Sequence, residues 1–206
     1  SLRSEFHFLN GIMDTNALTS SRLDVSQAAM GDILTDAQDF LATLVALREN
    51  NGSSDIVKAD AVGNLELLTS RLNTQLNGNF VFAGINTDQE PFADYSDPTS
   101  PNKLAADAAF MTEFGMAQSN LGVSGITPAA MSTYLNGAFE TMFQNPAWGS
   151  SWSSASSNVM VSRISASETV SSSVSANEQA FRDLAAAYTM MSDLGNEDLD
   201  PETWKV

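Results

Sequence analysis

Apolar residues between positions 20 and 50 recur at the spacing of one helix face. They form two interleaved ladders with a seven-residue period: Leu23, Met30, Ala37 and Leu44 in the first, and Ile33, Phe40 and Leu47 in the second. Acidic residues such as Asp24 and Asp39 occupy positions between them, and Asn51-Gly52 is typical of a helix end. The pattern predicts one amphipathic helix that ends near residue 50.

A second helix is predicted over 53–77. Leu65, Leu68 and Leu72 are spaced by three and four residues, so they share one face, and Asn77-Gly78 is typical of a helix end. The linking loop of about four residues places the two helices side by side and antiparallel. The seven-residue ladders fit either an intramolecular core or an oligomer seam, and the closely tethered second helix favours the core.

Shorter elements follow the two helices. Phe80-Val81-Phe82-Ala83 predicts a strand with both aromatic rings on one face. Residues 104–114 and 128–145 predict two further helices, the second capped by Thr127-Pro128. A serine-rich stretch over 150–175 has valines that alternate with polar residues, which predicts a hairpin that turns near 165–167.

A last strong helix is predicted over 177–195. Ser175 and Glu178 have the spacing of a capping box, in which each side chain bonds the other's free backbone amide. Phe181, Leu184 and Tyr188 form the apolar stripe of this helix, and Gly195 is its expected end.

Five of the six prolines lie between residues 90 and 150, a change of composition that indicates an insertion. The expected fold class is α+β and mainly α. We expect an elongated antiparallel helical rod built from residues 1–90 and 150–206, with a small hairpin and strand region, and an inserted outer domain over 91–149.

Charge excludes some classes of function. The 206 residues include 25 Asp and Glu but only 9 Lys and Arg, for a net charge of −16, which repels nucleic acid and anionic membrane surfaces. There is no cysteine, and His7 is the only histidine, so the usual zinc and thiol sites have no ligands. We therefore expect no enzymatic activity, no cofactor and no metal site.

The family resemblance rests on three stretches of the sequence. These are Arg22 to Met30, the run Asn79-Phe80-Val81-Phe82-Ala83-Gly84 followed by Pro91-Phe92, and Ser175 to Leu194. Together they resemble the hook-filament junction branch of the flagellin superfamily, the hook-associated protein 3 family. The resemblance covers about 20–92 and 150–195.

The resemblance implies an extracellular structural subunit of the bacterial flagellum that joins hook to filament by self-assembly. It would be exported without a cleavable signal peptide. The implied partners are hook-associated protein 1, flagellin, further copies of the chain and an export chaperone, with no nucleic acid and no membrane. We expect the chain to be an interior fragment that lacks the terminal polymerisation helices, and to be monomeric.

Two alternatives of the structural or binding class remain open, beside an enzyme on an unfamiliar α+β scaffold. The first is a filament flagellin, although residues 38–43 read Gln-Asp-Phe-Leu-Ala-Thr where many flagellins read Gln-Arg-x-Arg-Glu-Leu. The second is an acidic adhesin that stacks sugars on Trp148 and Trp152, residues that also fit anchors of the insertion to the rod.

Lateral packing of the rod would use polar residues of the first two helices. The candidates are Gln27, Asp36, Asp39, Lys58 and Arg71. For any one of them, a solvated helix face is the simpler explanation.

Overall fold

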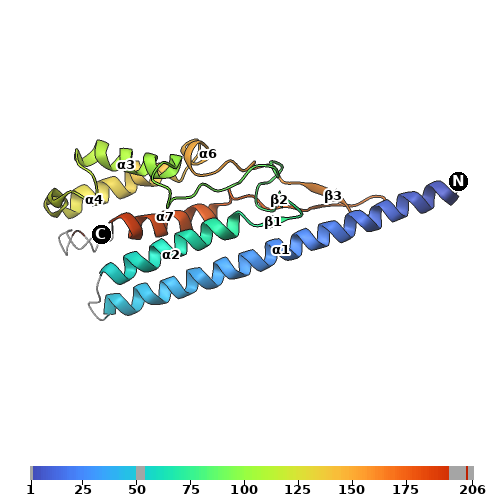
Figure 1. Ribbon diagram of the computed structural model, residues 1–206, viewed down its shortest axis with the longest axis horizontal. Coiled ribbons are helices and arrows are strands. Elements are labelled where there is room, and N and C mark those ends of the chain that lie inside the picture. The colour runs from blue at the N-terminus through green and yellow to red at the C-terminus, as the bar shows by residue number, and fades with distance from the viewer. Residues whose placement is uncertain (1, 50–53, 195–202, 204–206) are drawn as a thin grey trace.

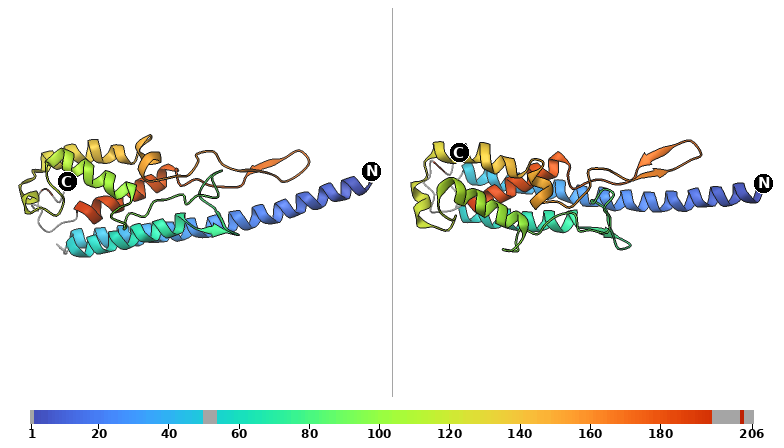
Figure 2. Two further views of the ribbon diagram at one scale, coloured as in Figure 1. Left: turned by 45° about the horizontal axis from the view of Figure 1, so that its top comes forward. Right: turned by 90° about the horizontal axis from the view of Figure 1, so that it is seen from above.

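A computed structural model describes residues 2–49, 54–194 and 203. The protein is elongated and mainly helical (Figure 1). A long hairpin of helices forms one layer, a single helix from the C-terminal part of the chain lies on it, and the helices of the central segment cover that helix. Figure 2 shows the same order of layers after a rotation of 45°.

The first layer consists of α1 (Leu2–Glu49) and α2 (Ser54–Leu72). The two helices pack side by side, as the short loop predicted. α1 begins near residue 2, well before the predicted ladder, and α2 ends at Leu72 rather than at Asn77-Gly78. The sequence therefore placed both helices correctly but misjudged one end of each.

The predicted strand over 80–83 is replaced by a tight hairpin of β1 (Gln75–Leu76) and β2 (Asn79–Phe80). Its two-residue loop is Asn77-Gly78, with φ angles of 52° and 80°. Positive φ at both loop residues is what such a hairpin requires, and Asn-Gly is the pair that tolerates it best. The residues read as a helix end thus form a strand turn.

The expectation that Phe80 and Phe82 share one face is wrong. Phe80 is partly exposed in β2, whereas Phe82 lies beyond the strand in a bend and is fully buried. The alternation of a strand holds only where the backbone stays extended, and here it does not.

The central segment is helical, as its patterns predicted. It contains α3 (Pro101–Phe114), a 3-10 turn (η1, Leu121–Gly125), α4 (Pro128–Tyr134), a π-helical turn (η2, Leu135–Phe139), α5 (Glu140–Met142) and α6 (Ala147–Ser151). Thr127 caps α4 by accepting a hydrogen bond from the Ala130 amide, at 3.3 Å. The run from α4 through η2 to α5 corresponds to the helix expected over 128–145.

The serine-rich stretch forms the predicted hairpin. β3 (Val161–Arg163) pairs antiparallel with β4 (Thr169–Ser171), with Ser162 opposite Val170. The hairpin lies along the N-terminal half of α1, where the Asn16 side-chain amide donates to the carbonyl of Ile164 at 3.1 Å.

α7 (Gln179–Leu194) lies on the α1–α2 hairpin, chiefly against α2. The predicted capping box does not form. Ser175 Oγ accepts from the Asn177 amide, not from that of Glu178, and the helix begins one residue after Glu178. The end predicted at Gly195 lies outside the described residues.

The core joins distant parts of the chain. Among the residues expected to pack in it, the buried ones are Ile33, Phe40, Leu65, Leu68, Leu72, Phe181 and Tyr188. The partly buried ones are Leu23, Met30, Ala37, Leu44 and Leu184. The side chain of Leu47 lies outside the described part of the structure.

The central segment shares this core. Trp148 and Trp152 are fully buried and stacked, 5.8 Å between ring centroids, and Phe92 lies against both. Rings without exposed surface cannot stack a sugar, so the adhesin role proposed for these two residues is wrong. The division into a rod and an inserted domain at residues 91 and 149 stays a prediction.

Candidate assembly surfaces and the Asp193 network

The N-terminal part of α1 projects beyond the rest of the protein (Figure 1). Leu2, Phe6, Leu9 and Met13 are exposed by 85%, 63%, 57% and 66%. Their spacings of four, three and four residues place them on one face of the helix. Sequence reasoning missed this stripe, although the spacing is visible in the first thirteen residues.

The polar candidates for lateral packing lie on α1 and α2 but do not form one cluster. Arg71 Nε donates to Asp36 at 2.6 Å, and Arg71 Nη1 to Asp32 at 2.8 Å. The hydrogen bond to Asp36 raises the pKa of Arg71. Asp36 and Arg71 therefore link the two helices of the hairpin within one chain.

The other three candidates take no part in the ion pairs of Arg71. Gln27 and Asp39 are exposed on α1, and Lys58 is partly exposed on α2. Twelve residues separate Gln27 from Asp39, which corresponds to about 120° around a helix. The two side chains thus belong to different faces, and their role in an interface stays a prediction.

Arg22 links α1 to the motif of the family resemblance, which consists of residues 79–84 and 91–92. It is 8% exposed, and its Nη2 donates to the carbonyl of Phe80 at 2.8 Å. Burial lowers the pKa of Arg22. The contact fixes the β1–β2 hairpin on α1, while Asn79 in the same hairpin is exposed.

The following motif residues contact segments that are far away in the sequence. The Phe82 ring meets Phe181 of α7 edge to face, at 5.8 Å, and Ala83 pairs with Ser175. Gly84 has a φ of +61°, and a Cβ atom there would lie 2.1 Å from the Ser156 carbonyl oxygen. Only glycine fits this approach.

The end of the motif packs in the same way. Pro91 and Phe92 are both buried, and Phe92 also pairs with Ser153 in an isolated bridge. The motif residues therefore hold strands and helices together in this chain, and a binding role for them is not needed to explain their types.

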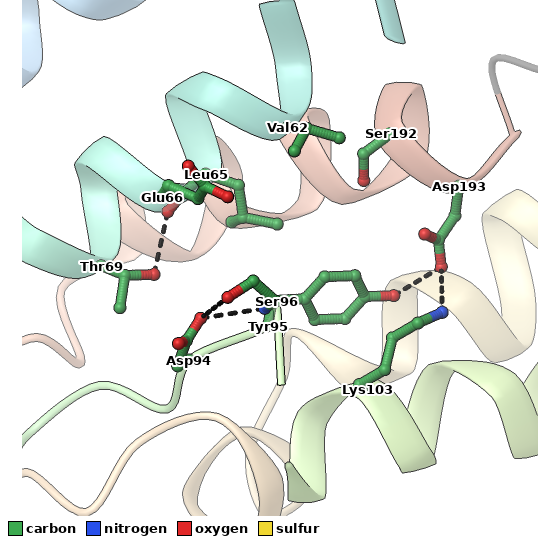
Figure 3. A pocket seen from close by; sticks show the side chains of 10 residues that line it. All are labelled: Val62, Leu65, Glu66, Thr69, Asp94, Tyr95, Ser96, Lys103, Ser192 and Asp193. Carbon is green, nitrogen blue, oxygen red and sulfur yellow. Dashed lines mark hydrogen bonds and ion pairs between the residues drawn. The ribbon is translucent and has the colours of Figure 1, made fainter. Parts of the chain in front are cut away.

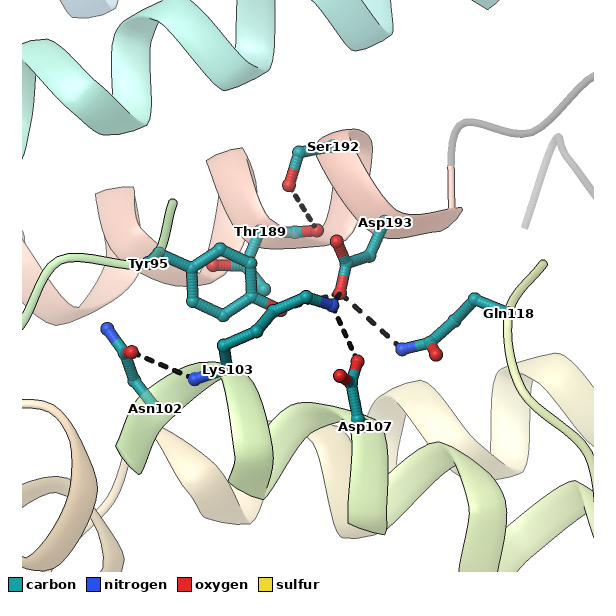
Figure 4. A network of polar contacts seen from close by, with 8 residues as sticks. All are labelled: Tyr95, Asn102, Lys103, Asp107, Gln118, Thr189, Ser192 and Asp193. Atoms are coloured by element: carbon teal, nitrogen blue, oxygen red, sulfur yellow. Dashed lines mark hydrogen bonds and ion pairs between the residues drawn. The ribbon is translucent and has the colours of Figure 1, made fainter. Parts of the chain in front are cut away.

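Asp193, in the last turn of α7, is the centre of a polar network (Figure 4). Its Oδ2 accepts from the Tyr95 hydroxyl at 2.5 Å, from Lys103 Nζ at 3.2 Å and from Gln118 Nε2 at 3.5 Å. Lys103 also bonds Asp107 at 2.5 Å. The network joins α7 to α3 and to the loops on either side of α3.

The electrostatics of the network favour its charged and bonded form. Burial tends to lower the pKa of Lys103, but the hydrogen bond to Asp107 and the charge of Asp193 outweigh it, so the pKa is raised. Burial raises the pKa of Tyr95, and the negative charge of Asp193 adds to the effect. Tyr95 therefore stays protonated and donates.

A small cavity of about 150 Å³ lies beside this network, between α2 and the loop that carries Tyr95 (Figure 3). Leu65 and Val62 contribute apolar surface, and Glu66, Asp94 and Asp193 contribute carboxylates. No reacting pair of side chains is assembled around it within the described residues.

Other chemical functions find little support in the part of the chain that the structure covers. Over residues 2–49, 54–194 and 203, no group of three or more His, Cys, Asp or Glu side chains is placed to hold a metal ion. In the same part of the chain, no helix combines the length and the apolar character that crossing a membrane requires.

Comparison with known proteins agrees with the long helical hairpin. Residues 1–87 match the family model of the bacterial flagellin N-terminal helical region, a stretch that contains α1, α2 and the β1–β2 hairpin. No curated protein and no solved structure matches the chain. Flagellins are structural, non-enzymatic proteins that are exported to the flagellum outside the cell. The match shows that the α1–α2 hairpin and the β1–β2 hairpin are similar to the N-terminal helical region of bacterial flagellins.

Proposed function

We propose that the chain is part of the subunit that joins hook to filament in a bacterial flagellum. The observation that carries this proposal is the apolar stripe of Leu2, Phe6, Leu9 and Met13 on the projecting end of α1. Burial of one such side chain stabilises an assembly by about 1.5–3 kcal/mol, so a helix that exposes four of them gains strongly from a neighbour.

The body of the protein suits a mechanical role in such an assembly. α7 and α2 pack together although more than a hundred residues separate them in sequence, and Asp193 ties the central helices to α7. A helical rod with such contacts at several points along its length can transmit force as a rigid body. Its partners would be hook-associated protein 1, flagellin and further copies of the same chain.

A filament flagellin is the second candidate, because the matching family model describes flagellins. The sequence at Gln38-Asp39-Phe40-Leu41-Ala42-Thr43 favours the junction subunit, since it differs from the arginine-rich pattern of many flagellins. We expect both candidates to assemble through the same stripe of α1. They differ in the position of the subunit in the flagellum.

The test is to express the full-length protein in flagellated cells and to find its position by immunogold electron microscopy. Labelling of a short zone between hook and filament is expected. Labelling along the filament would support the flagellin candidate, and absence from flagella that are otherwise complete would contradict both.

Variants then test the stripe itself. Phe6→Asp and Leu9→Asp place a charge on the apolar face and should abolish incorporation of the subunit. Thr15→Asp is the matched control, because position 15 is exposed on the opposite side of α1 and its hydroxyl bonds only the helix backbone. Equal incorporation of all three variants would contradict a role for the stripe.

A further inference from the structure

A groove of about 420 Å³ separates α7 from the run of α4, η2 and α5. On α7 it is lined by Gln179, Asp183, Ala186 and Met190, which share one face of the helix. The core residues Phe181 and Tyr188 lie on the opposite face. The groove is therefore a second surface of α7, independent of its packing on α2.

The floor of the groove is apolar and preformed. Phe139 and Phe143 are 6% and 4% exposed, and both belong to the core. Leu135, Ala186 and Met190 are partly buried beside them. The floor is thus held in place by the rest of the protein and offers a short apolar surface to the stem of a ligand.

The rim of the groove presents hydrogen-bond acceptors. Gln144 Nε2 donates to Glu140 at 3.1 Å, Gln179 Nε2 donates to Asp183 at 2.7 Å, and Asn136 Nδ2 donates to the Ser132 carbonyl at 2.8 Å. Each glutamine thus engages one carboxylate oxygen, Glu140 Oε1 or Asp183 Oδ1. The second oxygen of each carboxylate makes no hydrogen bond within the described residues, and a carboxylate only accepts.

The charge of the rim has one sign. Glu140 stands on one wall and Asp183 on the other, both exposed, and the lining contains no lysine or arginine. The ligand that complements this surface is a cation rich in donors and without acceptors. A guanidinium group has five N–H donors, no acceptor and a flat face, and its aliphatic stem packs on apolar surface.

We propose that this groove binds an arginine side chain that a partner protein presents. A second copy of the chain is the other possible occupant, and the dependence on protein concentration tests it. The site goes beyond the proposed assembly function: it lies on the α7 side of the body, and it uses none of the residues of the α1 stripe.

The first experiment titrates the 206-residue chain with an acetylated and amidated pentapeptide, Ala-Ala-Arg-Ala-Ala, and follows the side-chain amide signals of Gln144 and Gln179 by NMR. Both signals should shift on binding. A peptide with citrulline in place of arginine has nearly the same shape but no charge, and it should bind at least about tenfold more weakly.

Variants of the rim locate the binding site. Asp183→Asn and Glu140→Gln should each weaken peptide binding by about tenfold, and Asp183→Lys should abolish it, because it brings a cation into the groove. Asp24→Asn is the control, since it removes one exposed carboxylate of α1 far from the groove and should leave the affinity unchanged. All three positions are at the surface, so the four variants should fold.

Three results would overturn the proposal. They are equal binding of the citrulline peptide, equal affinity of the rim variants and the unchanged chain, and a shift of the Gln144 and Gln179 signals with protein concentration alone. The last result would assign the groove to a second copy of the chain. The titration needs no flagellar assembly, so a negative titration would not contradict the proposed function. A negative assembly experiment would likewise not contradict arginine binding by the groove.

Discussion

The ring of Phe40 on α1 meets the ring of Tyr188 on α7 edge to face, with 5.1 Å between the centroids and 80° between the planes. The two residues are 4% and 2% exposed. This contact joins the first helix of the chain to the last one described. It shows how the two ends of the sequence come to share one core.

Phe40→Ala should lower the free energy of unfolding by about 3–5 kcal/mol, because it removes a buried ring and leaves a cavity. Urea denaturation followed by circular dichroism measures the change. Asp39→Ala is the control: the neighbouring side chain is exposed, and its loss should cost less than about 0.5 kcal/mol. Similar costs for both variants would mean that the core is wrongly assigned.

Gly84→Ala should destabilise the protein far more than Gly78→Ala. Both glycines have positive φ, +61° and +80°, so alanine is strained at either position. At Gly78 there is open space around the added Cβ, whereas at Gly84 the Cβ would overlap the Ser156 and Asn158 carbonyl oxygens. Thermal unfolding of the two variants gives the comparison, and equal melting temperatures would contradict the close approach at Gly84.

Asp193→Asn should weaken the attachment of α3 to α7. The loss of a carboxylate that holds both Tyr95 and Lys103 is expected to cost about 1–3 kcal/mol. Asp107→Asn removes a more exposed partner of the same lysine and should cost less. Denaturation curves of the two variants measure the difference. A larger effect at Asp107 would contradict the central position of Asp193 in the network.

High pH should unfold the protein through its tyrosines. Burial raises the pKa of Tyr188 to about 12, and burial also raises the pKa of Tyr95 and Tyr134, which are the only other tyrosines. The folded state holds these protons more tightly than the unfolded chain, whose tyrosines titrate near about pH 10. Stability is therefore fully present below about pH 10 and is lost as the pH rises toward 12.

A spectrophotometric titration of the tyrosines checks this expectation. Ionisation should begin well above pH 10 and should coincide with unfolding measured by circular dichroism. Tyr188→Phe should lessen the loss of stability between pH 10 and 12. Ordinary titration of all three tyrosines near pH 10 in the folded protein would contradict their burial.

The sequence by itself determined the helical class of this protein and the location of its main helices. The seven-residue ladders of α1, the leucines of α2 and the stripe of Phe181, Leu184 and Tyr188 are local patterns, and a local pattern is enough to predict a helix with one buried face. The serine-rich hairpin was also predicted, because its valines alternate at the period of a strand.

Only the tertiary structure decided what lies between and around these elements. Asn77-Gly78 fits a helix end and a hairpin turn equally well, and the pairing of Gln75 with Phe80 selects the turn. The Asp193 network and the acceptor-lined groove unite residues that are tens of positions apart in the chain. No local periodicity encodes such contacts, because they arise when α7 packs between α2 and the central helices.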